Sequence, residues 1–226
     1  MPSCVVLLRE QELLNCRRPF LARGSKAIRC QTCLLAQNYC ICASKPEVQG
    51  KSAFLLLMYH GEVFKPSNTG RLIAEVVKDC HAFQWTRTDF DSRLLALLND
   101  PSYQPILVFP HEYAEPERCI DSPLQLPSLA NQEKTPLFVM LDGTWREAKK
   151  MFKTPYLAHL PVLGVHPQQG SRYLLREAAH LHQLCTAEVA IEALALAGDS
   201  AYSQGLAAYF ELFRHHYLKM KANTAL

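Results

Sequence analysis

The chain has 226 residues, of which 49% are hydrophobic, and a formal net charge of +3. This length fits one globular domain with a small appendage. No apolar run approaches the roughly 18–20 residues that a membrane span needs. The short apolar run at residues 5–8 is followed at once by charged residues, unlike the apolar region of a signal peptide. We therefore expect a cytoplasmic protein with no membrane partner.

The first 29 residues are strongly basic, with six basic side chains against Glu10 and Glu12, so this segment carries +4 of the charge and the remainder is about neutral. A basic arm beside a neutral body suits a polyanionic partner such as RNA, although a solvated surface would look the same. The basic residues are Arg9, Arg17, Arg18, Arg23, Lys26 and Arg29.

The pattern along the chain predicts a short helix and a basic linker over residues 1–25, then a cysteine-rich knuckle at residues 30–42. From residue 46 onward, apolar strands alternate with amphipathic helical stretches. This alternation is typical of a mostly parallel sheet with helices on both faces, so we expect an α/β fold. The expected strands are residues 53–59, 82–87, 106–109, 137–141 and 162–165, and the expected helices are residues 67–79, 92–98, 145–152, 186–197 and 202–218. Residues 110–136 lack a clear period and predict an insertion loop.

The knuckle contains Cys30, Cys33, Cys40 and Cys42, spaced C-x2-C, six residues, then C-x-C. In a reducing compartment, such clustered thiols more often hold a metal than form disulfides. Four thiolates can converge on one tetrahedral Zn2+, and four protein ligands leave no open position, so we expect a structural zinc site. The alternatives are an iron–sulfur cluster, whose usual spacings differ, and four unrelated buried thiols.

The turn Asp142-Gly143-Thr144-Trp145 follows the apolar run 137–141 and precedes a helical stretch. It therefore lies at the carboxyl end of a strand, where open α/β sheets bind ligands. Free backbone N–H groups there can receive a carboxylate, the indole of Trp145 can attract a sulfonium, and Asp142 can take or orient a proton. Structural roles are the alternative, because Thr144 and Glu147 match a capping box and Trp145 suits a core.

These residues resemble the signature of the DTW-domain family of tRNA-uridine aminocarboxypropyltransferases, which are related to the knotted SPOUT methyltransferases. The resemblance covers residues from about 17 to 217 through blocks in the family's order. The blocks are R-P-F-L-A-R-G at 18–24, the four cysteines, K-P-S-N-T-G-R-L at 65–72, V-F-P at 108–110, residues 142–151, Y-L-L-R-E at 173–177 and C-T-A-E-V-A at 185–190.

The resemblance implies a SPOUT-like fold with a C-terminal trefoil knot, in which residues 46–226 form the catalytic domain and residues 1–45 the arm and zinc knuckle. It implies transfer of the 3-amino-3-carboxypropyl group of S-adenosylmethionine to N3 of uridine 47 in the tRNA variable loop, with release of methylthioadenosine. The partner would be tRNA, and no obligate protein partner is indicated. An RNA methyltransferase and a non-catalytic zinc-containing RNA-binding protein are the alternatives.

The resemblance also implies the site residues, with Asp142 as the catalytic group. Ser67 and Thr186 have an alternative role as residues that start helices. Arg172 and Arg176 lie beside the implied pocket and suit contacts with phosphate or carboxylate groups. The S-adenosylmethionine pocket would comprise Ser67, Asn68, Thr69, Phe109, Pro110, Leu141, Gly143, Thr144, Trp145, Tyr173 and Thr186. The tRNA contacts would comprise Arg17, Arg18, Arg23, Lys26, Arg29, Arg172 and Arg176.

Overall fold

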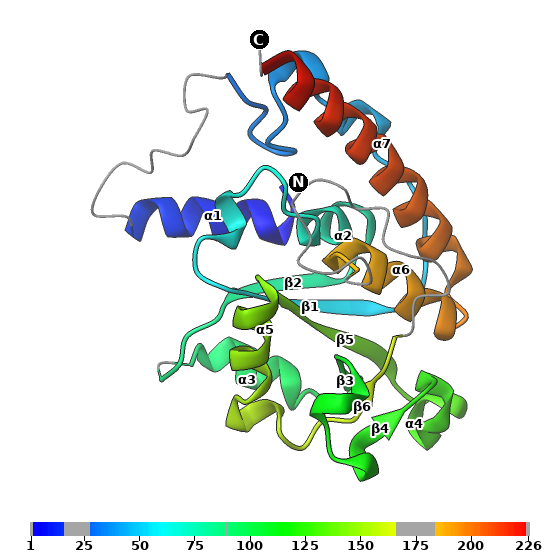
Figure 1. Cartoon of the computed structure of the whole chain (residues 1–226). Helices are drawn as coiled ribbons and strands as arrows, with labels where there is room; N and C mark the ends of the chain where they lie inside the picture. Colours follow the sequence, from blue (N-terminus) through cyan, green and yellow to red (C-terminus); the bar gives the residue numbers. More distant parts are fainter. Residues whose placement is uncertain (1, 16–27, 89, 166–183, 225–226) are drawn as a thin grey trace.

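A six-stranded, all-parallel sheet forms the centre of the computed structural model, which describes residues 2–15, 28–88, 90–165 and 184–224 (Figure 1). The strand order is β2-β1-β5-β3-β6-β4, so β5 lies between β1 and β3 although the chain reaches it late. The strands are β1 Ala53–Met58, β2 Cys80–Gln84, β3 Tyr103–Val108, β4 Cys119–Ile120, β5 Thr135–Asp142 and β6 Val162–Leu163.

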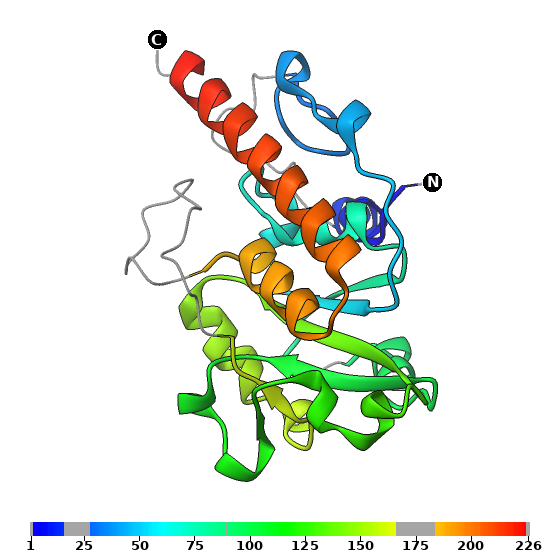
Figure 2. The same cartoon turned by 90° about the vertical axis from the view of Figure 1, so that its right-hand side faces the viewer.

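Helices cover both faces of this sheet, as the alternating pattern predicts (Figures 1 and 2). One face, called the α2 face below, packs against α1 Cys4–Asn15, α2 Gly70–Val76, α6 Thr186–Leu196 and α7 Ser200–Thr224. The other, called the α5 face, packs against α3 Ser92–Leu98 and α5 Trp145–Phe152. A short helix, α4 Pro127–Ala130, precedes β5. Within the described ranges, no helix combines the length and the apolar character that crossing a membrane requires.

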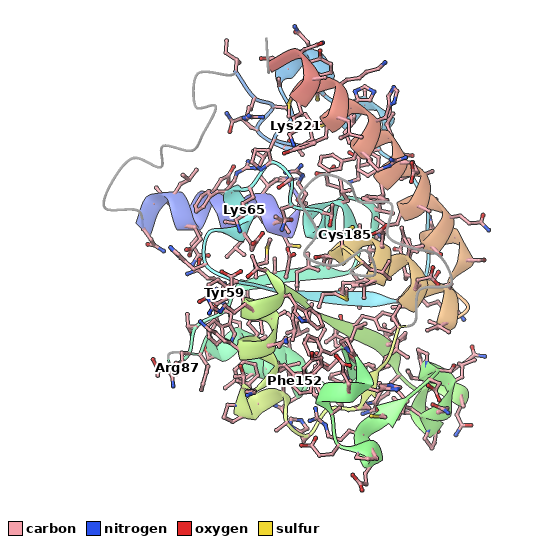
Figure 3. The ribbon with its side chains drawn as sticks, viewed as in Figure 1. Tyr59, Lys65, Arg87, Phe152, Cys185 and Lys221 are labelled. Atoms are coloured by element: carbon pink, nitrogen blue, oxygen red, sulfur yellow. The ribbon has the colours of Figure 1, made fainter. Side chains whose placement is uncertain are left out.

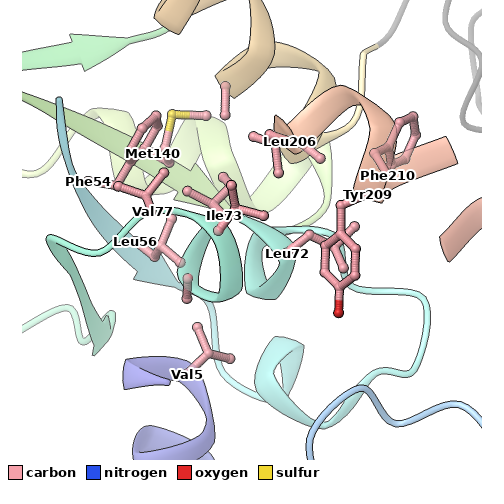
Figure 4. Packing of buried hydrophobic residues seen from close by; sticks show 14 of the residues in the cluster. Val5, Phe54, Leu56, Leu72, Ile73, Val77, Met140, Leu206, Tyr209 and Phe210 are labelled. Atoms are coloured by element: carbon pink, nitrogen blue, oxygen red, sulfur yellow. The ribbon is translucent and has the colours of Figure 1, made fainter. Parts of the chain in front are cut away.

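Strand β1 shows why the sheet is covered on both sides. All six of its residues are buried, and alternate side chains enter different cores: Phe54, Leu56 and Met58 the α2-face core, Leu55 and Leu57 the α5-face core. A parallel strand covered twice reads as a continuous apolar run rather than an alternating one. Figure 4 shows Phe54 and Leu56 packed with residues of α1, α2 and α7 on the α2 face.

Helix α2 differs from the sequence-based prediction of an amphipathic helix at 67–79. It spans only Gly70–Val76, and all seven of its residues are buried. Elements distant in sequence enclose it, since Leu72 and Ile73 lie between residues of α1, the sheet and α7 (Figure 4). Its two charged residues, Arg71 and Glu75, are buried as well, so the polar side that the amphipathic pattern assigns to solvent is enclosed by other elements.

Two strands begin or end at residues other than those predicted, because pairing with neighbouring strands outweighs the local amino-acid composition. Strand β3 begins at Tyr103 rather than at residue 106, so it includes Pro105. A proline has no backbone N–H to donate, but β6 pairs only with Leu107 and Val108, so Pro105 has no strand on that side and is tolerated. Strand β2 covers Cys80–Gln84 rather than residues 82–87, since Cys80 pairs with Phe54 at the start of β1. The predicted loop 110–136 contains the short strand β4, helix α4 and three 3-10 turns.

Helices α6 and α7 run in roughly opposite directions and form a helical hairpin (Figure 2). A glycine makes the short turn between them possible. Gly198 has a φ of +74°, and α6 ends in a Schellman motif, in which Asp199 N–H donates to Leu194 O at 2.9 Å and Gly198 N–H to Ala195 O at 3.0 Å. Asp199 then accepts backbone hydrogen bonds from Lys51 (2.8 Å) and Ser52 (2.9 Å), which ties the hairpin to the start of β1.

The expected C-terminal trefoil knot falls on a part of the chain that includes residues 166–183, outside the described residues. The division at residue 45 stays a prediction. Side chains from both sides of it, including Val5 of α1 and Leu35 of the knuckle, share the α2-face core with Phe54 of β1.

Candidate functional site

The carboxyl end of β5 brings together side chains from three separate sequence blocks. Asp142 ends the strand, points to the α2 face and is 3% exposed. Its Oδ2 accepts a hydrogen bond from Asn68 Nδ2 at 2.6 Å, and its Oδ1 accepts one from the Thr186 hydroxyl at 2.7 Å. Such bonds in a buried setting are strengthened by the low local dielectric. Asp142 is thus held in one orientation by the loop before α2 and by the first residue of α6.

The loop before α2 also joins α2 to α6. Asn68 Oδ1 accepts the Arg71 backbone N–H at 3.1 Å, and the Thr69 hydroxyl accepts the Ala187 N–H at 3.3 Å. Thr69 therefore satisfies a free donor in the first turn of α6 while preceding α2 as its N-cap residue. The interpretation of Ser67 as the N-cap is wrong, because the helix begins three residues later; Ser67 is buried in the same loop.

Two further charged side chains, Glu62 and Lys65, reach this cluster, and neither is among the predicted site residues. Glu62 is 1% exposed and pairs with the Lys65 ammonium, and its Oε2 lies 3.5 Å from Asn68 Nδ2. Lys65 is the first residue of the K-P-S-N-T-G-R-L block, so its place in that block could have identified it as a site residue. Glu62 lies in a 3-10 turn, Glu62–Phe64, whose burial depends on distant helices, so no local pattern marks it.

The remaining residues of the 142–145 turn point elsewhere. Both the backbone N–H (2.7 Å) and the hydroxyl (2.6 Å) of Thr144 donate to the Glu147 carboxylate, which confirms that the two residues pair at the start of α5. Gly143 packs closely, since a Cβ there would lie 3.1 Å from the Cβ atoms of Tyr59 and Glu147. The turn thus serves as a helix start and also carries Asp142 into the polar cluster.

Trp145 lies on the α5 face, on the opposite side of the sheet from the Asp142 carboxylate. Its indole stacks on Phe109 with ring centres 5.3 Å apart, and Tyr113 meets it edge-on at 5.7 Å. Leu141 packs in the same α5-face core, and Pro110 leads from Phe109 into the 3-10 turn His111–Tyr113. The predicted cofactor residues therefore fall into two groups: Asn68, Thr69 and Thr186 around Asp142, and Phe109, Leu141 and Trp145 on the α5 face.

The four cysteines of the knuckle converge as their spacing predicts. Their sulfur atoms all lie within 4.8 Å of one another, with Cys30 and Cys42 at 3.6 Å and Cys33 and Cys40 at 3.8 Å. Tetrahedral zinc with Zn–S bonds of about 2.3 Å places its sulfurs roughly 3.8 Å apart, so the arrangement fits a zinc ion. A disulfide would need sulfurs about 2.05 Å apart.

The protein environment gives the thiols of this cluster different pKa values. Burial opposes ionisation of Cys30, but backbone hydrogen bonds from Cys33 and Thr32 outweigh it and lower the pKa to about 7. Burial raises the pKa of Cys33 to about 11 and that of Cys42 still further. Because zinc binds thiolates, binding must release protons from these thiols, and acid should favour release of the metal.

A model of the DTW domain matches residues 27–218, from just before the first of these cysteines to within six residues of the end of α7. The chain belongs to the DTW domain family. The match includes the cysteine cluster, the loop before α2, Asp142 and Thr186, so the polar cluster and the knuckle lie inside one family domain. The family is associated with tRNA-modifying enzymes. No solved structure matches this chain.

The knuckle of this DTW domain rests on the end of α7, as Figures 1 and 2 show from two sides. His216 Nδ1 lies 3.1 Å from the Tyr39 carbonyl oxygen, and the Met220 sulfur accepts the Ala36 N–H at 3.1 Å. Arg29, a predicted RNA contact, donates to the Leu34 carbonyl oxygen at 3.1 Å and lies 3.6 Å from the same Met220 sulfur. Its guanidinium is thus engaged between the knuckle and α7.

Two buried arginines lie beneath the knuckle. The Arg9 guanidinium donates to the Gln31 carbonyl oxygen within the first cysteine pair, and Arg71 donates to Pro66 O at 2.6 Å and stacks on Phe213. Burial lowers the pKa of both; Glu10 and then Cys30 raise that of Arg9, and Glu75 and then Cys33 raise that of Arg71. Zinc on four thiolates would leave two net negative charges, which these cations are placed to balance.

The other predicted tRNA and cofactor contacts lie outside the described residues: Arg17, Arg18, Arg23, Lys26, Arg172, Tyr173 and Arg176. Cys185, in the C-T-A-E-V-A block, is described and precedes α6 (Figure 3). Burial raises the pKa of its thiol, so it is suited to packing rather than to attack as a thiolate.

Gly70 offers a sharp test of the Asp142 cluster. A Cβ at this position would lie 2.4 Å from Asp142 Oδ2, so Gly70→Ala should displace the carboxylate, even though alanine suits a helix better than glycine. We expect activity to fall by about 10²-fold, the scale of a small misplacement at a reacting centre. Urea unfolding should show a loss of about 1–3 kcal/mol, because the added methyl group overpacks a buried site. Wild-type tRNA-modifying activity in a folded Gly70→Ala protein would show that the position of Asp142 is unimportant.

Proposed function

We propose that this chain transfers the 3-amino-3-carboxypropyl group of S-adenosylmethionine to N3 of a uridine in the tRNA variable loop, uridine 47, in the cytoplasm. The observation that carries the proposal is the buried Asp142 carboxylate at the end of the central strand, held by Asn68 and Thr186 from two other family blocks. The cluster lies at the sheet edge where open α/β folds bind small molecules.

The chemistry needs one acceptor for the N3 proton and a fixed line of attack. S-adenosylmethionine supplies a carbon made electrophilic by its sulfonium. The N3–C bond forms as the C–S bond breaks, the electron pair stays on sulfur in methylthioadenosine, and the N3 proton leaves. The Asp142 carboxylate accepts hydrogen bonds from Asn68 and Thr186, which fix the direction in which it faces. We assign it the N3 proton, and we assign the loop 67–69 and the start of α6 to orienting the donor.

Zinc in this proposal is structural. Four cysteine ligands complete a tetrahedral shell and leave no position for a substrate. The knuckle would then hold the basic arm and the end of α7 in place, and the Cys30, Cys33, Cys40 and Cys42 thiolates would take no part in the transfer step.

Methyl transfer is the near rival, because the same sulfonium carries three electrophilic carbons. We would incubate the protein with a tRNA transcript and S-adenosylmethionine labelled differently on its methyl and aminocarboxypropyl carbons. We expect only the aminocarboxypropyl label in the RNA, together with one methylthioadenosine per modified uridine. Methyl label alone would overturn the proposal in favour of a methyltransferase. Binding of tRNA with neither label transferred would favour a non-catalytic RNA-binding protein.

A further inference from the structure

A pocket opens on the α5 face, away from the Asp142 carboxylate. It has a volume of about 520 Å³ and lies between α5 and the segment that follows β3. Its aromatic wall is Phe109, Tyr113 and Phe152, and its basic rim is Lys149, Lys150 and Lys153. Figure 3 marks the location through Phe152, at the end of α5. Pockets of roughly 300–1,000 Å³ hold small ligands, so one nucleotide fits.

The three lysines are available to a ligand, whereas the other charged groups of the lining are already engaged. Arg118 donates to Leu160 O and Leu157 O, both at 2.9 Å, and pairs with Glu115 at 3.0 Å. Across the described ranges, Lys149, Lys150 and Lys153 have no hydrogen bond or ion pair, and Lys149 Nζ lies 5.0 Å above the Tyr113 ring. The rim therefore presents three positive charges over an aromatic wall.

Helix electrostatics alone explain only part of this arrangement. Cations near the end of α5 complement the helix dipole, which accounts for lysines there but not for their position around an aromatic pocket. Single-stranded RNA is recognised by stacking of bases on aromatic rings and by basic side chains along the phosphates. Both features occur here in one pocket.

We propose that this pocket binds a nucleotide of the RNA substrate, with its base against the half-buried Tyr113 ring and its phosphate on Lys150 and Lys153. Phe109 and Phe152, which are 5% and 9% exposed and stack on each other at 4.6 Å, form the floor behind that ring. The inference rests on the proposed function for the identity of the RNA. Charge favours RNA over the sulfonium donor. S-adenosylmethionine carries one net positive charge, from a sulfonium and an ammonium against one carboxylate, and three lysines would repel it.

The pocket is coupled to the DGTW turn through ring packing. Trp145 stacks on Phe109 at 5.3 Å, and Lys149 Nζ lies 5.5 Å from the Trp145 ring. An RNA strand held by the pocket would therefore contact the same turn whose first residue, Asp142, faces the opposite side of the sheet. The pocket would therefore hold a flanking part of the RNA, because the Asp142 carboxylate itself faces the α2 side.

The test is a double charge reversal, Lys150→Glu with Lys153→Glu, in the full-length protein. Titrating an unmodified tRNA transcript at several salt concentrations should give a Kd raised at least tenfold. The slope of log K against log salt should be smaller by about 0.7–0.9, the contribution of the one phosphate that the two lysines contact. Titration with S-adenosylmethionine alone should give the wild-type Kd.

A matched control reverses Lys51 and Lys134, which precede β1 and β5 at the other edge of the sheet. That control should bind tRNA as the wild type does. Tyr113→Leu supplies an independent arm, because loss of stacking should weaken tRNA binding without changing the salt slope. Thermal unfolding would verify that each variant is folded.

The outcomes separate this inference from the proposed reaction. Wild-type tRNA affinity and salt slope in the double variant would overturn the pocket assignment, even if labelled transfer proceeds. Weakened S-adenosylmethionine binding with unchanged tRNA binding would also overturn it, because the pocket would then belong to the donor. Weakened tRNA binding, with no transfer of either label by the wild type, would support the pocket and overturn only the reaction.

Discussion

Replacing Asp142 with asparagine is expected to lower the rate of the proposed aminocarboxypropyl transfer by about 10²- to 10⁴-fold, the range that positioned acid–base groups contribute. The change keeps the shape of the side chain. Asn68 can still donate to the amide oxygen, and the Thr186 hydroxyl, which now donates to Oδ1, can turn to accept from the new amide. Loss of charge is then separated from loss of geometry. Single-turnover transfer with labelled donor measures the effect.

The affinity for S-adenosylmethionine should change far less than the rate, within about threefold by calorimetry, if Asp142 acts mainly after binding. Asp121→Asn is the matched control, because its carboxylate is 79% exposed and lies away from the cluster. It should retain the wild-type rate. Near-normal turnover in Asp142→Asn would exclude the carboxylate as the proton acceptor and leave it an orienting role.

The centre of the fold could be predicted because its signals are local. The run 137–141 is apolar without interruption, and Thr144 and Glu147 mark the helix that follows. The structure confirms both, with β5 at Thr135–Asp142 and α5 at Trp145–Phe152. Where signals depend on partners, the prediction failed. Pro105 reads as a strand breaker until it is known that β6 reaches only Leu107 and Val108.

The resemblance named residues for the candidate site but did not give their arrangement. Resemblance pointed to Asn68, Thr186 and Trp145 alike, yet only the first two bond to Asp142. The two ends of a four-residue turn face opposite sides of the sheet, and no pattern in sequence shows which side a turn residue takes. The burial of Glu62 could not be predicted from the sequence either, since it depends on helices distant in sequence.

In the zinc knuckle too, the ligands could be predicted from the sequence but their surroundings could not. Spacing alone identified the four cysteines whose sulfurs converge. It did not reveal that Leu35 and Ile41 are buried between the cysteines, or that Arg9 and Arg71 lie beneath them. These contacts bind the knuckle to α1, α2 and α7, so a metal site that spacing presents as an appendage shares its core with the main domain.

That shared core makes Cys30→Ser a large perturbation. A missing thiolate should reduce zinc content from one equivalent to near zero, and the loosened knuckle would expose Leu35 and Ile41, which are 0% and 1% exposed. We expect the protein to lose at least about 3 kcal/mol of stability. For a chain of this size each kcal/mol lowers Tm by roughly 2–4 °C. Metal analysis and thermal unfolding measure both effects.

Cys119→Ser is the matched control, since Cys119 lies on β4, far in sequence from the cluster, with its thiol donating to Glu115 O at 3.4 Å. It should keep one zinc and a nearly unchanged Tm. Chelation of the wild-type protein should reproduce the loss of Tm seen in Cys30→Ser, because both remove the same tetrahedral centre. One equivalent of zinc retained by Cys30→Ser would remove Cys30 from the ligands. Zinc lost with Tm unchanged would show that the knuckle holds its place on α7 through packing at His216 and Met220 alone.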